Sequence, residues 1–242
     1  MPSRADLPNR IESVLRVVYL VFNEGYSASA GTALIRPDLS AEAIRLGRLV
    51  VELLPEPEAV GLLALMLLLE SRRAARSSAD HDLILLADQD RSLWNRRLIR
   101  EGQALTEQAL ASRRIGPYSL QAAIAAVHAE ASTYAATDWA QILGLYDLLV
   151  RMDPSPIVNL NRAVAVSMRD GPAAGLALVE ALLASGELEN YHLAHAARAD
   201  LCRQLGRTTE ARVSYLRAWD LAGSEPERRF LQRRLGELSA ST

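Results

Sequence analysis

Proline, glycine, asparagine and aspartate divide this sequence into segments of helical length, and this regular division most limits the fold that the chain can adopt. Within each segment, apolar residues recur at positions i, i+3, i+4 and i+7, which lie on one face of a helix. Alanine and leucine, two strong helix formers, dominate the segments, and β-branched residues form no long alternating run. The pattern therefore predicts an all-α protein with about ten helices.

The expected helices differ in how deeply they should be buried. Residues 58–76 are apolar nearly all round, so this helix should lie deepest in the amino-terminal half. Ser40 and Asp90 are expected to cap the helices that they begin. The apolar run at residues 83–86 is too short for a stable helix and should form an extended segment or an irregular loop over the core. The expected helices span residues 7–24, 40–54, 58–76, 90–112, 117–132, 138–152, 155–169, 172–185, 191–205, 208–221 and 225–238.

The carboxy-terminal half has shorter helices and short connections, which are typical of antiparallel neighbours stacked into an α-solenoid. It carries three imperfect copies of the tetratricopeptide pattern of small and large residues. The large residues Tyr146, Leu178 and Tyr215 are 32 and 37 positions apart, on either side of the 34-residue period. Degenerate tetratricopeptide-like pairs are one interpretation, and another antiparallel helical array is the other. The copies are Ile142, Tyr146 and Leu149; Ala174, Leu178 and Ala181; and Gly206, Ala211, Tyr215 and Ala218.

Charge and cysteine content limit the partners of the chain. Its 27 basic and 29 acidic residues give a net charge of −2, which argues against direct binding of nucleic acid. The single cysteine, Cys202, forms no internal disulfide, which fits a reducing cytoplasm. Residues 1–10 lack the apolar core of a signal peptide, and the longest apolar run, at 59–69, is shorter than the ~20 residues of a membrane span. A cytoplasmic location without membrane contact is expected.

Two groups of residues resemble metal or catalytic sites. His192, His195 and Arg198 follow at intervals of three on one helix face, but no further ligand stands at a familiar spacing, so a polar stripe is the favoured interpretation over a metal site. Residues 88–91, Asp-Gln-Asp-Arg before Trp94, offer carboxylates for magnesium binding or acid–base chemistry. Asp90 is equally explained as a helix cap, and its neighbour Arg91 as an ion-pair partner of Asp88.

Other polar residues have structural explanations. Residues 23–26, Asn-Glu-Gly-Tyr, are typical of a helix terminus with Gly25 at its end. Gln121 and His128 are seven positions apart on an alanine-rich helix and should face either a groove or a buried polar network. The arginine pairs at 228–229 and 233–234 lie among glutamates and indicate a salt-bridged surface.

No nucleotide-binding or hydrolase motif is present: the sequence has no GxxxxGK[ST] loop, no GxGxxG turn after a strand and no GxSxG elbow. The residues therefore indicate no enzyme, no cofactor and no metal.

Seven blocks in order resemble the carboxy-terminal, tetratricopeptide-like extension of a group of bacterial extracytoplasmic-function sigma factors. The resemblance covers residues 11–238. The blocks are 18–29 (VYLVFNEGYSAS), 42–49 (EAIRLGRL), 62–68 (LLALMLL), 88–94 (DQDRSLW), 116–126 (GPYSLQAAIAA), 154–156 with 160–165 (PSP and LNRAVA), and 191–193 with 195–199 (YHL and HAARA).

This resemblance implies a role in transcription regulation. In such proteins two preceding sigma domains bind core RNA polymerase and promoter DNA, and the extension modulates them in place of a separate anti-sigma factor. A small YCII-related protein is implied as a further partner. This sequence lacks both sigma domains and a basic recognition helix, and residues 1–10 resemble a linker remnant. The expectation is an excised regulatory domain or a stand-alone relative, which does not initiate transcription by itself.

The domain organisation expected is an amino-terminal helical half at 11–112 stacked on a tetratricopeptide-like half at 113–242 as one continuous domain. The alternative function is a small-molecule sensor or an unrecognised enzyme, which requires Asn23, Glu24, Asp88, Gln89, Asp90, Gln121 and His128 to converge in one pocket. A stand-alone adaptor is a third possibility. Residues expected to contact a partner or ligand are Asn23, Glu24, Tyr26, Asp88, Gln89, Arg91, Trp94, Gln121, His128, Asn161, Arg162, His192, His195 and Arg198.

Overall fold

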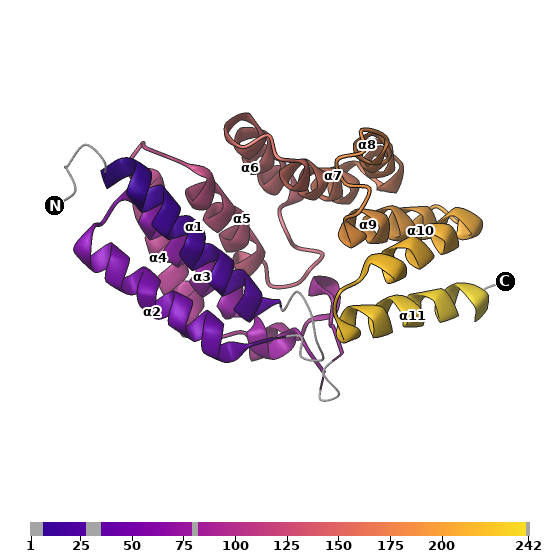
Figure 1. Cartoon of the computed structure of the whole chain (residues 1–242), viewed down its shortest axis with the longest axis horizontal. Coiled ribbons are helices and arrows are strands. Elements are labelled where there is room, and N and C mark those ends of the chain that lie inside the picture. The colour runs from indigo at the N-terminus through magenta and orange to yellow at the C-terminus, as the bar shows by residue number, and fades with distance from the viewer. Residues whose placement is uncertain (1–6, 28–34, 79–81, 241–242) are drawn as a thin grey trace.

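The computed structural model describes residues 7–27, 35–78 and 82–240, and this part of the chain contains eleven α-helices and no β-sheet (Figure 1). The prediction of an all-α, antiparallel helical array is confirmed. No helix within the described ranges is long and apolar enough to cross a membrane.

The first five helices form a bundle around α3, which contacts each of the other four. Nearly every side chain of α3 is buried, as its uninterrupted apolar sequence predicts. Proline at the first helical position starts α2, α3 and α5, since its missing N–H has no partner there anyway. The five are α1 (Leu7–Tyr26), α2 (Pro37–Leu53), α3 (Pro57–Glu70), α4 (Arg96–Ala111) and α5 (Pro117–Glu130).

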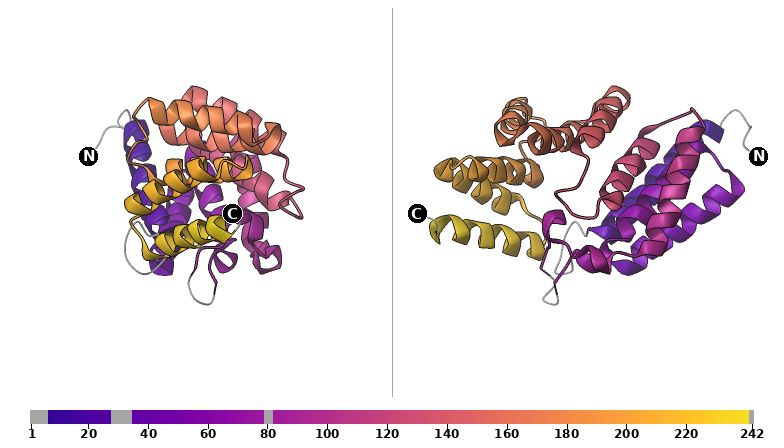
Figure 2. Two further views of the ribbon diagram at one scale, coloured as in Figure 1. Left: turned by 90° about the vertical axis from the view of Figure 1, so that its right-hand side faces the viewer. Right: turned by 180° about the vertical axis from the view of Figure 1, so that it is seen from behind.

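The remaining six helices form a curved stack in which each packs against the next along the chain, and α7 also contacts α9. Figure 2 shows that the last helix, α11, returns towards the lower end of the bundle. The chain therefore bends round on itself, and the concave face of the stack looks towards α5. The six are α6 (Trp139–Met152), α7 (Pro156–Asp170), α8 (Pro172–Ala184), α9 (His192–Gln204), α10 (Thr208–Leu221) and α11 (Glu225–Ala240).

Small residues allow close contact between α9 and α10. Ala211 and Ala218 are fully buried, and Tyr215 between them is 2% exposed, as the best copy of the repeat pattern requires. Ile142 and Leu149 of the first copy are also buried. Ala181 of the middle copy is exposed, so that copy follows the pattern least.

Three predicted local features are wrong. Asp90 caps only a short 3-10 turn, Arg91–Leu93, by accepting a hydrogen bond from the Ser92 backbone N–H; the helix after it begins at Arg96, where the Asn95 side chain caps it. Ser40 does not cap α2, which begins three residues earlier, but is fully buried. Gly25 lies inside α1 against α2, where a Cβ would stand 2.3 Å from the Ser40 nitrogen.

The segment between α3 and α4 extends from the bundle to α11, and its described residues, 71–78 and 82–95, form no α-helix. The helix expected at 58–76 ends at Glu70, and 3-10 turns follow at Arg73–Ala75 and Leu86–Asp88. Residues 82–88 of this segment, here called the strap, lie in the concave side of the stack (Figure 1). The expectation of an extended or irregular segment over the core is confirmed at residues 83–85, which form no helix and are half-buried.

Candidate functional site

A cleft of ≈ 560 Å³ lies between the two parts of the molecule. Its walls come from the end of α5, the loop after it, α6, α7, α9, Arg234 of α11 and the strap. Aromatic and polar side chains alternate with small ones along these walls. The lining residues are Leu85, Leu86, Ala87, Asp88, His128, Tyr134, Trp139, Ile142, Tyr146, Asn161, Val164, Ala165, Ser167, Met168, Ala197, Asp200, Leu201, Arg203, Gln204 and Arg234.

His128 is held in the cleft as a neutral imidazole. Its ring lies edge-on to Trp139, with 5.3 Å between the ring centroids. Burial, together with the nearby guanidinium groups of Arg72 and Arg91, lowers the pKa of His128 to about 4. Its Nδ1 atom is buried and has no hydrogen-bond partner within the described ranges. His128 therefore places a neutral ring at the cleft wall, while its Nδ1 atom is buried behind that wall.

Arg91 and Trp94 hold the end of α5 and do not line the cleft. The Arg91 guanidinium donates hydrogen bonds of 2.7 Å to the backbone oxygens of His128 and Ala131, and so satisfies carbonyls at the helix terminus. It also lies over the Trp94 ring, 4.4 Å from its centroid. The prediction that Arg91 pairs with Asp88 is wrong, because these carbonyls bind its guanidinium group.

Asp88 and Asn161 line the cleft together with His128. Asp88 and Asn161 are 73 positions apart in the chain, and the fold brings them to the same cleft. Both are exposed. Arg162, the neighbour of Asn161, points away and pairs with Asp147 at 2.6 Å. Three of the fourteen residues expected to contact a partner or ligand therefore share this cleft.

A second crevice, of ≈ 390 Å³, lies where the end of α1 meets α9 and α11. Asn23, Tyr26 and His192 line it together with Glu227. The His192 Nε2 atom is 3.2 Å from the Glu227 carboxylate. Glu24, although adjacent in sequence, is half-buried and lines neither this crevice nor the cleft.

The other predicted site residues form separate structural contacts. Gln121 accepts a hydrogen bond from the Tyr19 hydroxyl, and the Gln89 amide donates to the Ile84 backbone oxygen. His195 bonds the Glu189 backbone oxygen at 2.8 Å. Arg198 bonds Ser214, Glu180 and Glu210, which explains its place in a position where the repeat pattern has leucine.

In the stripe, His192 and Arg198 thus bridge to neighbouring helices, whereas His195 bonds the loop that precedes its own helix. Within residues 7–27, 35–78 and 82–240, no group of three or more histidine, cysteine, aspartate or glutamate side chains is placed to hold a metal ion.

Sequence reasoning missed most of the cleft. Trp139 and Tyr146 are seven positions apart on α6, and Asp200 and Gln204 are four apart on α9, so each pair shares a helix face. The spacing within each pair was the sequence signal that could have indicated a shared surface. Burial raises the pKa of Tyr146 to about 12, so its hydroxyl stays protonated and remains a hydrogen-bond donor.

Comparison with known proteins gives two matches. The model of a family of unknown function, DUF6596, matches residues 10–110, which include almost all of α1 to α4. An uncharacterized protein of Rhizobium meliloti (strain 1021) is 49% identical over 241 residues, which are 99% of this chain and 56% of that protein. The chain spans little more than half of its relative. No solved structure matches it.

Proposed function

We propose that the chain is a regulatory protein-binding domain of an extracytoplasmic-function sigma factor and modulates transcription initiation through contacts with the sigma domains. The observation that carries this proposal is the cleft on the concave side of the helical stack, walled by segments from both parts of the molecule. Concave faces of helical arrays are extended binding surfaces, and aromatic side chains beside polar ones suit a protein partner.

The blocks that resemble the sigma-factor extension support the choice of the cleft as the binding surface. Asp88 belongs to one block, Asn161, Val164 and Ala165 to a second, and Ala197 to a third. All five residues line the cleft. The resemblance therefore involves the binding surface itself as well as the helical core.

The length of the Rhizobium meliloti relative also supports the proposal, because a little under half of that protein lies outside the match. This part has room for further domains on which a regulatory domain acts. Core RNA polymerase is then an indirect partner, reached through the sigma domains, and a YCII-related small protein is a further partner. Direct contact with nucleic acid is not part of the proposal, given the net charge of −2. The place of action is the cytoplasm.

A small-molecule sensor or an enzyme is the second candidate, favoured by the neutral His128 ring that lines the cleft. This candidate requires seven polar residues to converge. Two of them, Asp88 and His128, line the cleft, whereas Asn23 lies in the second crevice and Gln121 bonds to Tyr19. Because these polar residues are scattered, a protein-binding role is favoured. A stand-alone adaptor would bind its partner in trans, and a domain of a longer protein would bind in cis.

The test is a titration of this chain with the part of the Rhizobium meliloti protein outside the match, followed by transcription with core RNA polymerase. We expect a complex that Asn161→Arg weakens at least about tenfold, because it places charge and bulk in the cleft. Asn190→Arg is the matched control, since Asn190 is also exposed but lies outside the cleft.

Two results would overturn the proposal. One is the absence of any complex, together with transcription that is unchanged when the region matching this chain is deleted from the relative. The other is a relative whose remaining part does not bind core RNA polymerase at all.

A further inference from the structure

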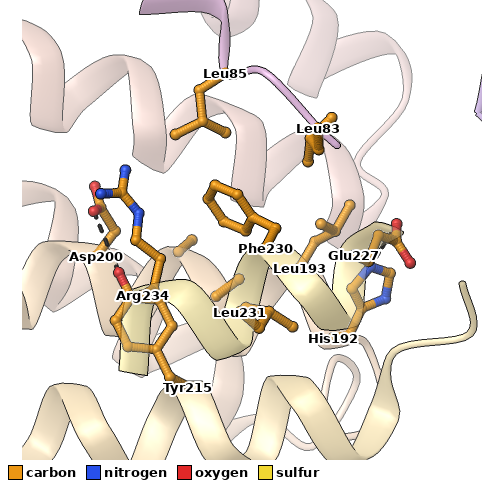
Figure 3. Close-up of a pocket in the computed structure, with 12 residues that line it drawn as sticks. Leu83, Leu85, His192, Leu193, Asp200, Tyr215, Glu227, Phe230, Leu231 and Arg234 are labelled. Carbon is orange, nitrogen blue, oxygen red and sulfur yellow. Dashed lines mark hydrogen bonds and ion pairs between the residues drawn. The ribbon is translucent and has the colours of Figure 1, made fainter. Parts of the chain in front are cut away.

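An apolar pocket of ≈ 270 Å³ lies between α9 and α11, next to the cleft (Figure 3). Leu193 of α9 and Phe230 and Leu231 of α11 form much of its wall, and two strap leucines, Leu83 and Leu85, enter it from the opposite side. Positions i and i+2 of an extended segment share a face, so both leucines point to the same surface. A segment of the bundle thus lies against the helical stack as an extended peptide would.

Ion pairs hold the amino-terminal end of the strap against α11. The Asp82 carboxylate, directly before Leu83, is 2.7 Å from the Arg229 side chain and 3.5 Å from that of Arg233. The sequence had indicated only a salt-bridged surface among the glutamates of α11, whereas these arginines pair with a residue about 150 positions earlier. The surface therefore binds the Asp82 carboxylate beside the two strap leucines.

The strap is held to the bundle by its backbone and to the stack by its side chains. Its Ile84 N–H donates to the Arg76 backbone oxygen at 2.9 Å. On the stack side, Leu83 and Leu85 are only half-buried, and all three charged side chains are partly exposed. Partly exposed ion pairs contribute little to stability, and half-buried leucines contribute less than fully buried ones, so this contact is weaker than one within a core.

Unfilled space remains beside the strap leucines, because the pocket volume is what their side chains leave open. Leu193 on its wall is 46% exposed. The strap leucines thus fill the pocket only in part, and its wall stays accessible.

We propose that the pocket between α9 and α11 is a docking site for an extended partner peptide with an acidic residue followed by Leu-x-Leu, and that the strap occupies it in cis. The partner peptide replaces Asp82 at Arg229 and Arg233 and replaces Leu83 and Leu85 in the pocket. This inference rests on the geometry of the stack and does not depend on a role in transcription.

The experiment uses a fluorescein-labelled peptide with the sequence of residues 81–89 and measures its anisotropy with the full chain. Leu83→Ser/Leu85→Ser in the chain is designed to release the strap, and it leaves the α9 and α11 walls of the pocket unchanged. We expect the released variant to bind the peptide about tenfold more tightly than the wild type if the strap is docked in nine molecules of ten. Leu93→Ser is the matched control, since Leu93 is 53% exposed and lies outside the pocket.

Three further variants in the released chain locate the site. Leu193→Glu should abolish binding, whereas Leu216→Glu, at a position 45% exposed on α10, should not change it. Arg229→Glu together with Arg233→Glu should weaken binding, and a peptide with arginine in place of the aspartate should restore it, because both partners of the Asp82 carboxylate then change sign. Circular dichroism checks the fold of each variant.

The proposal is overturned if the released and folded variant does not bind the peptide. It is equally overturned if neither Leu193→Glu nor the charge exchange that includes Arg233 changes the affinity for the peptide. The peptide assay contains no sigma domain, so its failure is distinct from failure of the proposed function.

Discussion

His128 should make the stability of this protein fall in mildly acidic solution. Its pKa is about 4 in the folded chain against an ordinary value of 6.5, because the ring is buried beside Arg72 and Arg91. Above pH 7 the imidazole is neutral in both states and has no effect. As the pH falls through 6.5 the unfolded chain binds a proton that the folded chain does not bind, so the free energy of unfolding decreases.

The size of the effect follows from the difference between the two pKa values. One pKa unit corresponds to about 1.4 kcal/mol, so a difference of about 2.5 units gives a full loss of about 3 kcal/mol below pH 4. At pH 5 the two binding equilibria give a loss of about 2 kcal/mol. That is a substantial part of the stability of an ordinary domain, about 5–15 kcal/mol.

The assay is urea denaturation at pH 7.5 and pH 5.0 of the wild type and of His128→Gln, which keeps a polar side chain but does not titrate. Carboxylates titrate in both proteins, so the difference between their pH dependences isolates His128. We expect the wild type to lose about 2 kcal/mol more than the variant between the two pH values. The chain has four histidines, and the signal missing from the NMR spectrum of His128→Gln assigns the resonance.

Two results would refute this reasoning. Parallel pH dependences would mean that His128 does not discriminate between the folded and unfolded states. A measured His128 pKa near 6.5 would mean that the ring is more hydrated than its place against Trp139 and Arg91 allows.

Two further predictions concern the contact between α3 and α5. The half-buried Glu58 carboxylate of α3 accepts hydrogen bonds from the Tyr118 and Ser119 N–H groups and the Ser119 hydroxyl, so Glu58→Ala should lower the free energy of unfolding by about 2–4 kcal/mol in urea denaturation; a loss below about 1 kcal/mol would show that water replaces this cap. Gly61→Ala would place a Cβ within 2.7–2.9 Å of Ser119 atoms and should cost about 1–3 kcal/mol, measured the same way. Gly144→Ala is its control, because nothing lies within 4 Å of that Cβ and the change should stabilise α6 by about 0.5–1 kcal/mol; equal effects of the two substitutions would contradict the packing argument.

The helices were predictable because each has a local signal. Prolines at the first helical position, the cap residues Asp138 and Ser155, and the apolar periodicity mark most boundaries to within a few residues. Some errors lie where α1 packs against α2, at Gly25 and Ser40, and the others lie in the segment between α3 and α4. There Asn95 caps α4 while its backbone N–H donates to the Ser71 oxygen, a contact that sequence spacing does not reveal.

The candidate site was only partly predictable, because its members meet through tertiary packing. Asp88, His128 and Asn161 were each singled out from local sequence, but nothing local indicated that they share a cleft. Gln121 bonds to Tyr19 in the buried polar network that was one of its two expected settings, whereas Arg91, expected to pair with Asp88, bonds to the end of α5. A polar residue on a helix face signals a partner, and only the fold determines whether that partner lies inside the protein.

The strap connects the pocket with the cleft, because Leu85 lines both and residues 86–88 continue along the cleft wall. Ala197, Asp200 and Arg234 are also common to the two cavities. A peptide that displaces the strap from the pocket therefore removes one wall of the cleft. Consider a partner that binds the cleft only in its open form. By linkage, the factor by which the peptide tightens the binding of this partner equals the factor by which the partner tightens the binding of the peptide. Docking in the pocket would then regulate the partner contacts of the cleft through residues 82–88.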